Sequence, residues 1–295
     1  MMKPVVQKIK VKSVLTKSNL PVADFSMNPY VGCTHACKYC YACFMKRFTN
    51  HAENWGEFLD VKYWEPIKNP KKYEGKEFFF GSVTDPYNPQ EEEFRRTRAL
   101  LEELKGNDIK ISIQTKSDLV LRDINLIKTF PNARVGFSIN TLDEAFRADM
   151  DNAVSIERRL SAMKKLHDEG IRTTCFISPI FPGITDVKAI VERVKNQCNL
   201  VWLENLNLRG TFRPVIMDYI RQQHAELVPL YEEIYSKGNR DYWEKLDTEL
   251  RAYAKESGLS YVRNDDSMNL PFDSPPLLVN FFYHEEIKKS VMKNA

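Results

Sequence analysis

The sequence predicts an α/β protein whose parallel strands form an open, partial (β/α)6 barrel of the TIM type, with short terminal additions. Strand-like and helical segments alternate between residues 77 and 206, which is the pattern of βαβ crossovers and a parallel sheet. Five clear strands in that range and a further one near residues 27–31 give six βα units. Six units are too few to close an eight-fold barrel, so an open one is expected.

The expected strands are short segments that are either apolar throughout or alternate between apolar and polar residues. IKISIQ at residues 109–114 shows such alternation, and TTCFIS at residues 173–178 ends at a turn that contains Pro179. The strands expected in the barrel are 77–80, 109–114, 134–140, 173–178 and 200–206. A half-exposed strand is also expected around Ile9, between alternating lysines, and residues 277–282 form a final apolar run.

Helices are expected where apolar residues recur at helical spacing. The segments are 91–104, 119–129, 156–169, 186–196, 213–235 with an interruption at Pro229, and 242–257. Gly170 is placed to end one helix, and Asp186 is a good N-cap for the next.

Composition and charge exclude several classes of protein. The chain has 43 basic and 40 acidic residues and a net charge of +3, so it is neither a histone-like polycation nor an acidic disordered chain. No run approaches the roughly 18 apolar residues of a membrane span, and the N-terminus lacks an apolar signal stretch. We therefore expect a cytoplasmic protein without a membrane partner. The expected organisation is a basic N-terminal extension (1–24), a catalytic core (25–240) and a C-terminal helical cap (241–295).

Cysteine spacing is the strongest chemical signal. Four of the six cysteines fall within residues 33–43, and Cys33, Cys37 and Cys40 follow the pattern C-x3-C-x2-C. A tight group in a chain without an export signal indicates metal binding rather than disulfides, and three thiolates can hold three corners of an iron–sulfur cluster. A zinc finger would require paired motifs. His35 as a fourth ligand would close the site, so we expect it to support the loop.

At these residues the chain resembles the radical S-adenosylmethionine (SAM) superfamily, which has this spacing and an aromatic residue, here Tyr39, before the third cysteine. The resemblance extends over roughly residues 20–210 to the spore photolyase-like branch. It is carried by Asn28-Pro29-Tyr30, Thr84-Asp85-Pro86-Tyr87-Asn88-Pro89, Thr115-Lys116-Ser117-Asp118 and Val135-Gly136-Phe137-Ser138. The ending VNFFYHEEIKK is similar to radical SAM proteins that are encoded as pairs on mobile elements.

The resemblance implies that the cysteine trio holds a [4Fe–4S] cluster whose fourth iron binds SAM. One electron from a low-potential donor would cleave SAM to methionine and a 5′-deoxyadenosyl radical, which abstracts hydrogen from the substrate. The metal ligands would be Cys33, Cys37 and Cys40. The candidate SAM-binding residues, most of which follow expected strands, are Tyr39, Ser82, Thr84, Asp85, Lys116, Ser117, Ser138, Asn140, Pro179 and Ile180. Among them, Asp85 has the charge to bind the SAM amino group, and Lys116 has the charge to neutralise its carboxylate.

The catalytic residues are unknown from the sequence. Cys43 and Tyr41 are candidates for a hydrogen donor or relay, with packing as the alternative role, and Cys175 and Cys198 are expected in the core. Three hypotheses about function remain open. They are a radical SAM enzyme that acts on DNA or another nucleic acid, one that modifies a peptide or small molecule with a partner protein, and a non-catalytic, metal-stabilised nucleic-acid-binding protein. Polar residues around the expected strand ends speak against the third hypothesis, because a structural metal site has no need of them.

Overall fold

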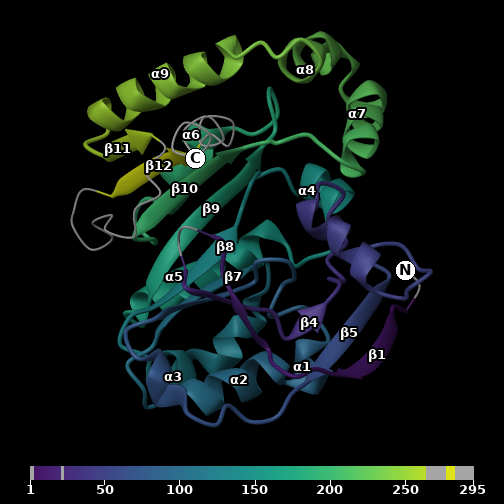
Figure 1. The fold of residues 1–295 in the computed structure, drawn as a ribbon. Helices are drawn as coiled ribbons and strands as arrows, with labels where there is room; N and C mark the ends of the chain where they lie inside the picture. The colour runs from purple at the N-terminus through teal and green to yellow at the C-terminus, as the bar shows by residue number, and fades with distance from the viewer. Residues whose placement is uncertain (1–2, 21–22, 264–276, 283–295) are drawn as a thin grey trace, which may run out of the picture.

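The computed structural model describes residues 3–20, 23–263 and 277–282, and a large, mostly parallel sheet runs through its centre (Figure 1). Within the described residues this sheet has nine strands, in the order β11-β12-β10-β9-β8-β7-β6-β3-β2. Every neighbouring pair is parallel except β2 and β3. The strands are β2 (Leu15–Lys17), β3 (Phe25–Met27), β6 (Glu77–Phe80), β7 (Lys110–Thr115), β8 (Ala133–Ser138), β9 (Arg172–Ile180), β10 (Leu200–Asn205), β11 (Ser260–Arg263) and β12 (Leu278–Phe282). The predicted α/β class with a parallel sheet is confirmed, and the partial barrel of six units stays a prediction.

The five strands expected between residues 77 and 206 are present as β6 to β10. Their sequences are apolar because helices or loops cover much of the sheet on both sides. Phe78 and Phe80 in β6 are fully buried, and Ile111 and Ile113 alternate with more exposed residues in β7. These side chains belong to one continuous hydrophobic core that also includes residues of the covering helices.

The first strand differs from the prediction. The sequence predicts one strand over residues 27–31, whereas the structure has two short strands in different sheets, β3 and β4 (Tyr30–Val31). Asn28 and Pro29 separate them. Pro29 has no N–H group to donate to a neighbouring strand, and the side chain of Asn28 donates to Ser82 Oγ at 2.9 Å. The two residues therefore interrupt the regular strand.

A second, three-stranded sheet lies beside the first in the order β1-β5-β4. The strand expected around Ile9 is confirmed as β1 (Val5–Lys10), which pairs in parallel with β5 (Phe58–Tyr63). β5 pairs antiparallel with β4, so this small sheet holds the segment that leads into the cysteines. Strand β5 has no counterpart in the prediction.

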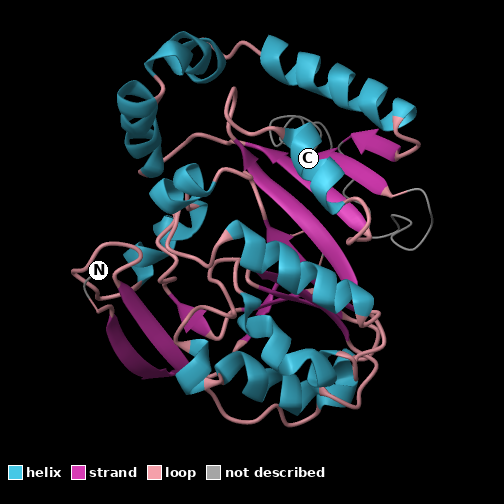
Figure 2. Ribbon diagram, turned by 180° about the vertical axis from the view of Figure 1, so that it is seen from behind, coloured by secondary structure: helices cyan, strands magenta, loops and turns pink. Residues whose placement is uncertain are grey.

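Helices cover the outer side of the large sheet, and α2, α3 and α5 lie in front of it in Figure 2. The helices are α1 (Glu91–Phe94), α2 (Arg96–Leu104), α3 (Ile124–Ile127), α4 (Glu144–Met150), α5 (Ile156–Asp168), α6 (Val187–Val194), α7 (Phe212–Gln223), α8 (Val228–Tyr235) and α9 (Asp241–Glu256). The 3-10 helices are η1 (Tyr41–Phe48), η2 (Pro70–Tyr73), η3 (Asp118–Asp123) and η4 (Ala225–Leu227). Among the described residues, every helix is too short or too polar to traverse a lipid bilayer.

Two predicted helices are interrupted and two predicted helix ends are confirmed. The helix expected over 213–235 is interrupted at residues 224–227 and not at Pro229, because proline is tolerated in the first turn of a helix and Pro229 lies in the first turn of α8. Arg95 adopts φ 50° and divides the helix expected over 91–104 into α1 and α2. The segment expected to be helical over 119–129 is mostly the 3-10 helix η3 followed by the short α3. Asp186 caps α6 by accepting from the Ala189 N–H at 2.9 Å, and Gly170 follows α5 with φ +79°.

The C-terminal part adds both helices and strands. Figure 1 shows α7, α8 and α9 following one another along an arc at one end of the molecule. After α9 the chain forms β11, and β12 lies between β10 and β11 in the sheet. The apolar run at residues 277–282 therefore belongs to the large sheet. The boundaries of the three predicted segments stay predictions.

Candidate functional site

The predicted site residues lie at the carboxyl edge of the large sheet, where parallel strands end side by side. Hydrogen bonds join neighbouring strand ends. Asp85 after β6 accepts from Thr115 Oγ1 at 2.7 Å at the end of β7, and Gln114 Nε2 donates to Ser138 Oγ at 3.1 Å at the end of β8. Ser178 in β9 donates to Glu204 in β10 at 2.9 Å. The structure therefore connects the strand ends that the sequence singled out.

The three motif cysteines lie half-buried on the loop between β4 and η1. The turn is built from main-chain bonds, from Ala36 N to Cys33 O at 3.2 Å and from Cys40 N to Cys37 O at 3.1 Å. Burial raises the pKa of each thiol, and a negative charge on Cys40 would raise the pKa of both Cys33 and Cys37 further. A charged Cys40 would therefore disfavour charge on the other two thiols, so the loop favours a partner that compensates thiolate charge.

Contacts with three other segments hold this loop. Thr84 Oγ1 donates to Gly32 O at 2.5 Å, which ties the start of the loop to the segment after β6. Lys38 N donates to Met150 O at 2.9 Å, and Asn152 N donates to His35 O at 2.7 Å. Gly32 has φ +89°, and a Cβ there would lie 2.5 Å from the Phe58 carbonyl oxygen, so this tight approach requires glycine.

His35 and Asp85 face each other beneath the loop, with 3.0 Å between His35 Nε2 and Asp85 Oδ2. Both side chains are buried, and the carboxylate of Asp85 also accepts from the N–H groups of Tyr87 and Lys116. Burial would raise the pKa of Asp85, but His35 and the hydrogen bonds from Thr115 and Lys116 outweigh it and hold the pKa below its usual range. These contacts agree with a loop-supporting role for His35. In these contacts the Asp85 carboxylate is bound by other groups of the protein. Its role in binding SAM stays a prediction.

The side chains of Tyr39 and Lys116 lie beside the cysteine loop. The Tyr39 hydroxyl donates to Asp151 Oδ2 at 3.3 Å, and Lys116 Nζ lies 5.5 Å from the centre of the Tyr39 ring. The positive charge of Lys116 lowers the pKa of Cys37, Cys40 and Asp151 relative to the effect of burial alone. Lys116 therefore supplies positive charge beside the cysteine loop.

Arg159 of α5 stabilises the part of the site around Tyr39 and Asp151, although the sequence did not identify it as a site residue. Arg159 is fully buried and donates to Asp151 Oδ1 at 2.7 Å and to the Ser138 carbonyl oxygen at 3.1 Å. It thereby connects the end of β8 with the carboxylate that holds Tyr39. Its neighbour Arg158 is exposed, and the helical spacing of Ile156, Met163 and Leu166, which places Arg159 in their apolar stripe, was the available signal.

The other predicted SAM-binding residues also lie at strand ends. Ser117 Oγ accepts from Leu119 N at 3.2 Å and so caps η3. Asn140 is buried after β8, and its Nδ2 has no hydrogen-bond partner, which leaves a donor for a bound group. Pro179 and Ile180 end β9, where Ile180 is fully buried.

The candidate catalytic residues Tyr41 and Cys43 lie on η1. The Tyr41 hydroxyl donates to the Ser82 carbonyl oxygen, next to the predicted SAM site. Cys43 Sγ lies 3.2 Å from Thr211 Oγ1, in the segment before α7. Cys175 and Cys198 are buried in the main core, which agrees with the expected packing role.

A buried network of ion pairs, which the sequence did not predict, supports the site. Glu91 is fully buried, accepts from the Tyr30 hydroxyl and pairs with Arg122 at 2.7 Å. Arg122 also pairs with Asp123 at 2.8 Å, and Asp123 accepts from the Tyr87 hydroxyl at 3.1 Å. Tyr30 and Tyr87, which contribute to the family resemblance, therefore have structural partners. The run of three acidic residues at 91–93 is the sequence feature that could have indicated this network.

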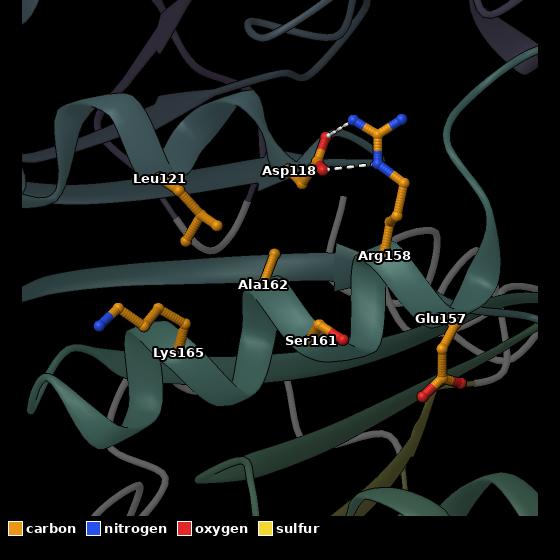
Figure 3. Close-up of a pocket in the computed structure, with 7 residues that line it drawn as sticks. All are labelled: Asp118, Leu121, Glu157, Arg158, Ser161, Ala162 and Lys165. Atoms are coloured by element: carbon orange, nitrogen blue, oxygen red, sulfur yellow. Dashed lines mark hydrogen bonds and ion pairs between the residues drawn. The ribbon is translucent and has the colours of Figure 1, made fainter.

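A surface hollow of about 440 Å³ lies elsewhere, between η3 and α5 (Figure 3). Arg158 and Asp118 form an ion pair across it at 2.7 Å. Its lining contains none of the predicted site residues. Among the described residues, no group of three or more His, Cys, Asp or Glu side chains is arranged to hold a single metal ion.

A mostly parallel sheet with a three-cysteine loop tied to its carboxyl edge defines the class of radical SAM enzymes. The chain belongs to the radical SAM superfamily, whose family model matches residues 27–194. Enzymes of this superfamily use a [4Fe–4S] cluster and SAM, so the predicted family and cofactors are confirmed.

Individual relatives give further comparisons. An uncharacterised protein of Methanocaldococcus jannaschii is 39% identical over 233 residues, which is 78% of this chain and 86% of that protein. The radical SAM Nalpha-GlyT isomerase of Pseudomonas phage M6 is 26% identical over 56% of this chain and 36% of its own length. Spore photoproduct lyase in complex with dinucleoside spore photoproduct has a similar fold, with a TM-score of 0.63, 14% identity, and coverage of 94% of this chain and 82% of the lyase.

Proposed function

We propose that Cys33, Cys37 and Cys40 bind a [4Fe–4S] cluster and leave its fourth iron for SAM. The observation that carries this proposal is the single half-buried loop that bears all three thiols and is tied to the carboxyl edge of the sheet. Each cysteine would bind its own iron, so the thiols need not converge on one ion as they would around zinc. When bound, the cluster supplies an electron that cleaves SAM to methionine and a 5′-deoxyadenosyl radical.

The residues of this chain would bind and orient SAM. We propose that Lys116 neutralises the SAM carboxylate, because its ammonium group already lies beside the cysteine loop. The unpartnered Nδ2 of Asn140 would donate a hydrogen bond to the cofactor. The segment at Ser82 and Thr84 would present backbone carbonyl groups to the SAM amino group, and Ile180 would contact the adenine. Tyr41 and Cys43 stay candidates without an assigned step.

We further propose that the substrate is a nucleoside unit of DNA. Support comes from the fold likeness to spore photoproduct lyase, whose structure contains a dinucleoside photoproduct. The partial-barrel arrangement and a cytoplasmic location complete the proposal. It also requires a low-potential electron donor, because cleavage of SAM consumes one electron.

Anaerobic reconstitution tests the cluster and the cleavage of SAM. With iron, sulfide and dithionite, the wild-type protein should bind about four irons and release 5′-deoxyadenosine. Cys37→Ala should lose both, whereas Cys198→Ala, which changes a buried thiol outside the motif, should retain both. Zinc in place of iron, together with no release of 5′-deoxyadenosine, would contradict the proposal and favour a structural metal site.

Deuterium transfer tests the substrate class. Hydrogen abstraction moves a substrate hydrogen to 5′-deoxyadenosine, so perdeuterated DNA should yield deuterated 5′-deoxyadenosine by mass spectrometry. Perdeuterated protein and small-metabolite fractions serve as the matched controls. Deuterium from either of those fractions and none from DNA would replace the nucleic-acid proposal by modification of a peptide or small molecule.

A further inference from the structure

An exposed group of aromatic rings and one cation lies on η1, directly after Cys40. Tyr41, Phe44 and Phe48 are 51%, 42% and 67% exposed. The guanidinium of Arg47 lies 5.5 Å from the Phe44 ring centre and 4.6 Å from the Phe48 ring centre. We call Tyr41, Phe44, Arg47 and Phe48 the aromatic–basic face. Exposed apolar residues that cluster in this way indicate a binding surface, whereas scattered ones do not.

Helix geometry places three of these side chains in one row. A 3-10 helix has three residues per turn, so Tyr41, Phe44 and Arg47 align, while Phe48 falls in the row of Ala42 and is exposed at the C-terminal end of the helix. Ala42, which is buried, and Cys43, which packs against a second hydrophobic cluster, hold the helix to the protein. The rings are therefore presented on a fixed support.

The aromatic–basic face begins at the rim of the proposed active site. The Tyr41 hydroxyl donates to the carbonyl oxygen of Ser82, which follows β6. A ligand lying along Phe44 and Phe48 would thus extend outward from the edge at which strand β6 ends.

The charge around this face suits a polyanion. Between residues 34 and 52 the sequence contains Lys38, Lys46 and Arg47 and no Asp or Glu. Flat aromatic rings next to cations are the chemistry that binds unpaired bases and their phosphates. A stacked arginine keeps N–H groups that can donate to a phosphate oxygen. An acidic peptide would match the charge but offers no regular series of flat rings for Phe44 and Phe48.

We propose that the aromatic–basic face binds a single-stranded DNA segment next to the nucleotide that reacts. Bases would stack on Phe44 and Phe48, and Arg47 between them would bind the phosphate backbone. This inference rests on the proposed nucleic-acid substrate and adds the surface that holds the neighbouring nucleotides.

Fluorescence anisotropy with a labelled oligothymidylate of 20 nucleotides tests this surface, using anaerobically reconstituted protein. The double variant Phe44→Ala/Phe48→Ala should lose at least about fivefold in affinity for each ring removed. Arg47→Ala should flatten the dependence of log affinity on log salt by about 0.7. The matched control is Arg251→Ala on α9, which removes another exposed arginine stacked on a ring, at 5.1 Å from Tyr261. It should change neither quantity.

Release of 5′-deoxyadenosine without DNA separates failure of this inference from failure of the proposed function. All these variants should match the wild-type rate, because none of the changed residues belongs to the proposed cofactor site. If the wild-type protein cleaves SAM but the double variant binds the oligonucleotide equally well, the aromatic–basic face is not the DNA site. Equal affinity of the wild-type protein for duplex and single-stranded DNA would also overturn the inference. So would a double variant that loses binding to a partner protein but keeps its affinity for DNA.

Discussion

Replacement of Arg159 by methionine tests whether a buried ion pair supports the cofactor site. Arg159 and Asp151 are 0% and 1% exposed, and Arg159→Met would deprive the buried Asp151 carboxylate of its nearer guanidinium partner, leaving that of Arg147 at 3.9 Å. Such a loss costs about 3–5 kcal/mol. With an unfolding entropy of about 2.1 cal/mol/K per residue over 295 residues, a cost of about 4 kcal/mol lowers the melting temperature by roughly 6 °C.

Differential scanning calorimetry of the apo protein measures this shift. The control is Arg158→Met, the same change at the neighbouring position, where the arginine is 61% exposed and its ion pair with Asp118 is worth at most about 1 kcal/mol. A double variant that also carries Asp151→Leu should recover part of the loss, because it removes the buried carboxylate that has lost Arg159. Equal melting temperatures for Arg159→Met and Arg158→Met would refute this account of the pair.

Three further predictions concern residues around the cysteine loop. The indole N–H of Trp55 is buried without a hydrogen-bond partner of its own, and Trp55 lowers the pKa of Cys40 against the larger effect of burial. Trp55→Phe should therefore make the cluster potential more negative by about 40 mV in a redox titration, and an unchanged potential would speak against this influence of Trp55. Burial lowers the pKa of His51, but its two carboxylate partners raise it above the ordinary value. The stabilisation is thus complete below about pH 6.5 and lost as pH rises through the folded-state pKa, so the difference in stability between wild type and His51→Gln should narrow as the pH rises above about 6.5. A gap that widens would reverse this assignment. Gly81→Ala should cost about 1–3 kcal/mol more than Gly170→Ala in chemical denaturation, because both have positive φ but only the Gly81 Cβ would lie 2.5 Å from a backbone oxygen; equal costs would contradict the steric argument.

Periodicity and spacing predict the parts of this protein that depend on local sequence. Strands β6 to β10 are short and apolar, and the cysteine loop has a fixed spacing, so both were found. Strand β5 was missed because FLDVKY has no clear alternation and its pairing with β1 is a long-range contact. The break at Arg95 was missed because nothing in the sequence requires an arginine to adopt positive φ.

Side-chain partners across the sheet are harder to predict than strand ends. The sequence identified Asp85 as a polar residue after a strand but gave no indication that His35, Thr115 and Lys116 would surround its carboxylate. Arg158 and Arg159 are adjacent on α5, and the helical periodicity places Arg159 on the apolar face, but its partners Asp151 and Ser138 depend on tertiary packing. Pattern reasoning therefore locates the edge of the site, and the structure supplies its electrostatics.

The ties of the cysteine loop have a consequence for cluster maintenance. The bonds from Thr84 to Gly32, from Lys38 to Met150 and from Asn152 to His35 use only polypeptide atoms. We expect the loop to keep its shape when oxygen destroys the iron–sulfur cluster, so that a folded binding loop remains rather than an unfolded segment. Refilling would then need iron, sulfide and reductant but no refolding.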